Sequence, residues 1–227
     1  MSDAAAIRIV RHPRARGMRL SVDPASGEVR LTLPPRVRVE RGLAWAREKQ
    51  GWIAAQRATL PAAIPFVPGT KLPVDDRDVV IEWAPDHPRA PARIGDRLCC
   101  GGPAERLPAR IEAWLKREAR AVLEADTQAA ALRAGVTVSS VGIGDPRSRW
   151  GSCAASGAIR YSWRLLLAPR FVRQATVAHE VAHRLHMHHG PAFHAAVAEI
   201  LGSDPAPAMA WLRRHGAGLH WFGKSPG

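Results

Sequence analysis

A five-residue motif in the last quarter of the chain carries side chains of the types that can hold a metal ion and move a proton. Residues 179–183 read His-Glu-Val-Ala-His. On a helix, side chains four residues apart lie on the same face, so the imidazoles of His179 and His183 can reach one ion. Two neutral nitrogen ligands and an open position suit zinc, and Glu180 can accept a proton from a water at that position. The motif therefore predicts a hydrolytic site with one zinc ion.

A tetrahedral zinc site needs a third protein ligand. His186 lies seven residues after His179, about 10 Å along a continuous helix, so three ligands in one row cannot converge on one ion. His189 directly precedes the helix-breaking pair Gly190-Pro191, so its side chain can turn back toward the metal. We favour His189, and Glu199 on the next helix is the alternative. The remaining histidines that we weighed, and expect around the site or on the surface, are His186, His188 and His194.

Hydrolysis of an amide also needs a donor that stabilises the oxyanion of the transition state. Arg149, Tyr161 and His186 carry donors near the motif in sequence. No spacing compels any of the three, so each is a candidate contact for substrate or transition state. Tyr161 is the only tyrosine in the chain, and a lone tyrosine on a strand is also typical of half-buried packing.

The three cysteines, at positions 99, 100 and 153, indicate neither a disulfide framework nor a CxxC metal site. We interpret Cys153 as a small buried residue, with a fourth zinc ligand as the alternative.

Basic residues are concentrated at the start of the chain. The net charge is +13, and the first fifty residues hold eleven Lys and Arg against five Asp and Glu. Such a basic arm suggests an anionic partner such as nucleic acid, although heavy arginine use is also typical of a GC-rich genome. The residues that we expect to contact this partner are Arg8, Arg11, Arg14, Arg16 and Arg19.

Length and hydropathy exclude several protein classes. With 227 residues and 46% hydrophobic content, the chain can form one globular domain or two small ones. No apolar run approaches the ~20 residues of a membrane-spanning helix. Met1 to Arg19 lacks the apolar block and cleavage site of a secretory signal. We therefore expect a cytoplasmic protein that does not enter a membrane.

The hydrophobic pattern changes near residue 104, and we place a domain boundary there. Residues 1–103 should form a β-rich N-terminal region with one helix, and residues 104–227 the metal-binding domain. The expected elements of the first region are strands within 7–33, a helix over 38–59, and strands near 71–74 and 78–83. Those of the second are a helix from 104 to Gly135, a strand over 136–143, two extended segments within 147–167, and helices near 170–187, 192–201 and 204–214.

The segment from Ser148 to Cys153 allows two interpretations. In one, Arg149 and Trp150 fill space and Gly151 makes a turn. In the other, a strand over 158–167 is the edge beside which an extended peptide pairs.

Two stretches resemble the YgjP-like metallopeptidase family, which is related to the SprT-like and WLM zinc proteases. One is His179-Glu180-x-x-His183-x5-His189 followed by Gly190-Pro191-Ala192-Phe193. The other is Ser148-Arg149-Trp150-Gly151-Ser152-Cys153 with its continuation to Pro169. Ser162, Gly190 and His194 depart from residues that are frequent in the family.

The resemblance implies an α+β, zincin-like catalytic domain whose HExxH helix packs on a small twisted sheet. It also implies His179, His183 and His189 as zinc ligands, Glu180 as general base, and a protein or peptide substrate. SprT-like relatives act on proteins attached to DNA, so a DNA-associated protease is one alternative. A zinc hydrolase of a non-peptide amide is another. A purely structural metal site would have no use for Glu180.

Overall fold

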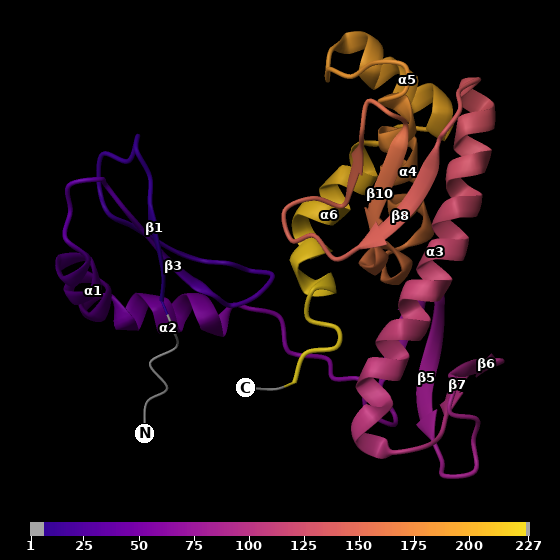
Figure 1. Ribbon diagram of the computed structural model, residues 1–227, viewed down its shortest axis with the longest axis horizontal. Helices are drawn as coiled ribbons and strands as arrows, with labels where there is room; N and C mark the ends of the chain where they lie inside the picture. The colour runs from indigo at the N-terminus through magenta and orange to yellow at the C-terminus, as the bar shows by residue number, and fades with distance from the viewer. Residues whose placement is uncertain (1–6, 226–227) are drawn as a thin grey trace. The chain divides into compact units, whose positions relative to one another are not determined.

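Residues 7–225 are the part of the chain that this computed structural model describes. They form six α-helices and three small mixed sheets, which confirms the expected α+β class (Figure 1). The chain divides into two units, Met1–Ala62 and Ala63–Gly227. Residues 1–6, the first part of the segment examined for a secretory signal, lie outside the described residues. No helix described here is both long enough and apolar enough to cross a bilayer.

In the first unit, alternating apolar residues form the predicted strands β1 (Arg8–Arg11), β2 (Arg19–Val22) and β3 (Val29–Leu33). β3 is central, parallel to β1 and antiparallel to β2. Its buried residues Leu31 and Leu33 form a small core with Ala46. The expected single helix over 38–59 is two helices, α1 (Val39–Glu48) and α2 (Gln50–Ala58), because Lys49 leaves helical geometry between them.

The second unit begins with a four-stranded sheet of order β4-β5-β7-β6. The strands β4 (Lys71–Val74) and β5 (Arg77–Trp83) match the prediction, whereas β6 (Ala92–Ile94) and β7 (Arg97–Cys100) lie in a stretch expected to be loop. The apolar residues of this sheet share one core with the helix that follows. The expected boundary at 103/104 therefore falls inside the second unit, where the change in pattern marks the start of a long helix.

That helix, α3 (Leu107–Ala134), ends at Gly135 as predicted, where the glycine adopts the left-handed conformation with φ of 64°. A three-stranded sheet follows, with β8 (Ser140–Gly144), β9 (Gly151–Cys153) and β10 (Ala158–Ser162) in the order β8-β10-β9. β10 is central and leads into the 3-10 helix Trp163–Leu167. The expectation that residues 158–167 form a free edge is therefore wrong, and β9 is an outer strand instead.

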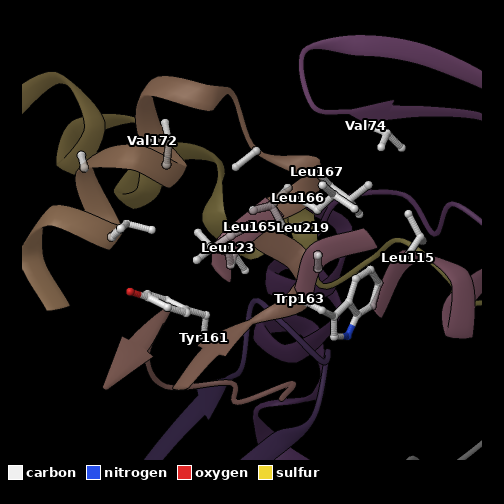
Figure 2. Close-up of a cluster of buried hydrophobic side chains, with 14 of the residues drawn as sticks. Val74, Leu115, Leu123, Tyr161, Trp163, Leu165, Leu166, Leu167, Val172 and Leu219 are labelled. Atoms are coloured by element: carbon white, nitrogen blue, oxygen red, sulfur yellow. The ribbon is translucent and has the colours of Figure 1, made fainter. Parts of the chain in front are cut away.

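The HExxH motif lies on α4 (Arg170–Ala182), which packs against α3, β9 and the last two helices, α5 (Pro191–Leu201) and α6 (Ala206–Leu219). α4 contributes Val172, Val177 and Val181 to the core. Figure 2 shows part of this core, where Tyr161 and Trp163 lie among aliphatic side chains. α4 ends earlier than the predicted residue 187, because the chain turns at His183.

Three acidic side chains fix the start of α4. Arg173 is buried, and its guanidinium pairs with Asp126 of α3 at 2.7 Å and with Asp75 of the β4–β5 turn at 2.8 Å. The neighbouring Asp76 accepts a hydrogen bond from the backbone N–H of Arg170 at 3.0 Å. Residues far apart in sequence thus determine where the metal-binding helix begins.

We expect Arg173→Met to lower the free energy of unfolding by about 3 kcal/mol, because it leaves the largely buried Asp126 without its partner. Equilibrium unfolding in urea measures the change. Arg170→Met is the matched control, since Arg170 is exposed on the same helix. Equal stability of the two variants would contradict an anchoring role for Arg173.

Candidate metal centre

Three histidine side chains meet at the end of α4. One ligand nitrogen of each of His179, His183 and His189 lies within 4.8 Å of the other two, and the Nε2 atoms of His179 and His189 are 3.2 Å apart. A tetrahedral zinc ion with Zn–N bonds of about 2.05 Å separates its ligand nitrogens by about 3.3 Å. The spacing of these nitrogens therefore fits one zinc ion.

The third histidine comes from the loop, as the sequence predicts. His189 stands directly before Gly190, which precedes α5, and its ring turns back toward α4. Glu199, the alternative ligand, is exposed on α5 and does not belong to the group. Among residues 7–225, His186, His188 and His194 also lie outside this group of ligand atoms.

A backbone carbonyl orients one of the three rings. His183 Nδ1 lies 3.2 Å from the carbonyl oxygen of His186, so the Nδ1–H donates to this oxygen. That tautomer leaves the lone pair of Nε2 available to a metal. His186 thus contributes its carbonyl, while its side chain is exposed. Because α4 has already ended, the argument from a continuous helix does not apply to His186.

A buried phenylalanine supports the histidines. The ring of Phe193, on α5, has its centroid 4.9, 4.6 and 4.7 Å from those of His179, His183 and His189. An apolar wall of this kind restricts the imidazole orientations and excludes water from behind the ligands. Reasoning from residue types missed this role, for which the only sequence signal was the position of Phe193 just after the third histidine.

Glu180 is buried and lines the same hollow as His179. Burial raises the pKa of its carboxyl to about 7, an effect that the positive charge of Arg149 opposes. Burial also lowers the pKa of His179 to about 4, and the charges of His183 and His189 add to this. The imidazole of His179 is therefore neutral near pH 7, as a metal ligand must be.

Gly151 gives Glu180 its space. A Cβ atom on Gly151, the first residue of β9, would lie 2.5 Å from Oε1 and 2.6 Å from Cγ of Glu180. Any larger residue would displace the carboxylate. The sequence suggested only a turn at this glycine, because the close approach of β9 to α4 is a tertiary contact.

A hollow of about 180 Å³ opens beside Glu180 and His179. Trp150 on one side and Met209 and Leu212 of α6 on the other give it apolar walls, and the exposed Arg149 stands at its edge. Gly216 of α6 allows Trp150 to approach, since a Cβ there would lie 2.9 Å from the indole. The arrangement places a basic group, a buried carboxylate and one of the three clustered histidines, His179, around one cavity.

The sequence of this chain matches a known protein family over most of its length. A model described as "YgjP-like, metallopeptidase domain" matches residues 16–215. The chain belongs to the YgjP-like metallopeptidase family. Membership supports a metal-dependent hydrolase in general, and the metal of such an enzyme is usually zinc. No curated protein and no solved structure showed a significant match.

Not every residue predicted for the site lies at the YgjP-like metal centre. Tyr161 is fully buried, and its hydroxyl oxygen accepts a hydrogen bond from Thr127 Oγ1 at 3.1 Å. It therefore offers no donor to a substrate, contrary to one of the three suggestions. Cys153 is partly buried on β9 and lies outside the histidine group.

The arginines predicted to contact an anion belong to the other unit. Arg8 pairs with Glu28 at 3.6 Å, and Arg11 donates to the carbonyls of Pro34, Pro35 and Val37. The side chains of Arg14, Arg16 and Arg19 are exposed, and the last two line a hollow.

A second group of potential ligands in the YgjP-like chain is Glu82, His87 and Cys99. Here the carboxylate of Glu82 lies 3.1 Å from the guanidinium of Arg97 and 3.6 Å from the imidazole of His87. These ion-pair contacts account for the arrangement without a metal ion, so we expect one zinc per chain.

His189→Ala should weaken zinc binding by at least about 100-fold, because it removes one of three ligands. Competition with a chromogenic chelator gives the affinity. His188→Ala, an exposed histidine next to it, should bind zinc as the wild type does. If both variants keep full affinity, the third ligand is another residue.

Proposed function

We propose that this protein is a zinc-dependent peptidase that hydrolyses peptide bonds with Glu180 as general base. The observation that carries the proposal is a buried carboxylate, Glu180, that lines the same hollow as His179, one of three histidines whose ring nitrogens have zinc-ligand spacing. Family membership supports the reaction class, and this geometry supports the role of each residue.

A zinc ion held by His179, His183 and His189 would polarise the peptide carbonyl and lower the pKa of the attacking water. Glu180 accepts the proton of this water as its oxygen bonds to the carbonyl carbon. The carboxyl then delivers the proton to the leaving nitrogen as the C–N bond breaks. Burial raises the pKa of Glu180, which strengthens the carboxylate as the base that takes the proton from water.

Arg149 is the candidate donor for the oxyanion. It is exposed at the edge of the hollow, and its charge acts on Glu180. Of the three donors suggested by the sequence, Tyr161 is buried in the core and His186 directs its carbonyl to His183. The guanidinium of Arg149 can therefore stabilise negative charge that develops beside the same carboxylate.

The outer strand β9 supports an extended peptide as the substrate. One side of β9 pairs with β10, and no other strand among the described residues pairs with its second side. Its first residue touches Glu180. A peptide that adds to this edge would pass the catalytic carboxylate, and an apolar side chain of the peptide would fit between Trp150 and Leu212. A non-peptide amide would use neither feature.

We expect Glu180→Gln to retain one zinc per chain and to reduce kcat on an unfolded protein substrate by about 10²–10⁴-fold. Metal analysis and a cleavage assay, run on the same preparations, test this. Glu199→Gln is the matched control, because this glutamate is exposed on α5 and should leave both values unchanged.

Two outcomes would contradict the proposal. Wild-type protein without stoichiometric zinc would exclude the metal site, and full zinc without cleavage of any peptide would favour a non-peptide amide as the substrate. Adding single-stranded DNA to the assay tests the alternative of a protease that acts on DNA-bound proteins, for which cleavage should increase.

Gly151→Ala should lower kcat at least about tenfold while zinc content stays at the wild-type level, since the three atoms nearest to the new methyl group all belong to Glu180. Gly218→Ala on α6 is the control, because a Cβ there meets nothing within 4 Å. Wild-type activity of Gly151→Ala would show that the position of Glu180 is not critical.

A further inference from the structure

The N-terminal sheet separates apolar and basic side chains onto opposite faces. Side chains alternate along a strand, so Leu20 of β2 and Leu31 of β3 face the helices of this unit. Arg19 and Ser21 of β2 point to the other face. In the antiparallel register, Arg19 lies opposite Thr32 and Ser21 lies opposite Arg30. Two arginines and two hydroxyl groups thus alternate on one surface.

The loop between β1 and β2 extends this surface into a hollow of about 500 Å³. His12 and Arg16 of the loop line it together with the four strand residues, and the lining contains no acidic side chain. Arg16, Arg19 and Arg30 make no ion pair with the residues that the structure describes. Three unpaired guanidinium groups around one concavity create a strongly positive local potential.

Arg8 and Arg11 of β1, in contrast, have partners within this unit, a difference that the sequence does not reveal. Glu28 neutralises the charge of Arg8 in an ion pair. Arg11 donates hydrogen bonds to three backbone carbonyls of the segment that follows β3. Arg30, which the sequence did not single out, belongs to the unpaired group because its register places it opposite Ser21.

We infer that this face binds the phosphodiester backbone of a nucleic acid through Arg16, Arg19 and Arg30, with Ser21 and Thr32 as additional donors. Arginine and hydroxyl side chains are the usual donors to phosphate oxygens. The guanidinium groups are spread over two strands and a loop, which suits a polymer with repeated charges better than a single phosphate.

The lining also argues against other anionic partners. It holds no Phe, Tyr or Trp side chain, so stacking on bases should contribute little and binding should depend little on sequence. Ala15 is its only aliphatic residue, whereas a protein interface needs larger apolar anchors. A concave polar surface also offers nothing to insert into a membrane.

Anisotropy of a short labelled single-stranded DNA, titrated with full-length protein over a series of salt concentrations, tests the inference. We expect binding that weakens with salt, and Arg19→Ala/Arg30→Ala should lose at least about tenfold in affinity. The slope of log affinity against log salt should become less steep by about 1.4, the value for two phosphate contacts on a single strand.

The matched control is Arg41→Ala/Arg47→Ala, which removes the same charge from exposed positions on α1 of the same unit. It should keep most of the affinity and the slope. No binding by the wild type, or an equal loss in both double variants, would overturn the inference. Binding of inorganic triphosphate or of anionic vesicles as tight as that of DNA would also overturn it. Each outcome is independent of peptidase activity.

Discussion

The buried guanidinium of Arg173 is the interaction on which the geometry of the second unit depends. It joins α4 to α3 through Asp126 and to the β4–β5 turn through Asp75. A buried charge is tolerated only when its partners are held in place, so α4, α3 and the β4–β5 turn must take their native positions together. His179, near the far end of this anchored helix, and His183, directly after it, are held by the same anchor. Their position is therefore set by contacts about two turns away from the metal centre.

The close contact between β9 and α4 sets the environment of the Glu180 carboxylate, and with it the pKa of this group. Gly151 lies against Glu180, and this contact removes the carboxylate from water. Desolvation then favours its protonated form. The same contact places the outer strand next to this carboxylate. One small residue thus links the proton affinity of Glu180 to the position of the strand edge at which we propose that an extended substrate pairs.

The histidine cluster depends on apolar support as much as on its ligands. Phe193 touches all three rings, and the carbonyl of His186 orients His183. The sequence predicted neither role. Phe193 acts through an apolar ring and His186 through its backbone carbonyl, and neither group is a metal ligand. In the N-terminal unit, too, tertiary contacts decide that the side chain of Arg11 is engaged whereas that of Arg30 makes no ion pair among residues 7–225. Both are arginines in short strands, and only the register and neighbouring carbonyls determine which one is free to meet a ligand.

The sequence by itself determined the features that depend on local spacing. The i, i+4 pair His179 and His183, the stop at Gly135 and the alternating strands of the first unit follow from helix and strand periodicity. Tertiary structure alone brought His189 and not Glu199 next to His179 and His183, buried Tyr161 in the core and made β9 an outer strand. It also paired β6 and β7, whose short segments carry little periodic signal between prolines. These outcomes depend on contacts between residues far apart in the chain, which periodicity does not encode.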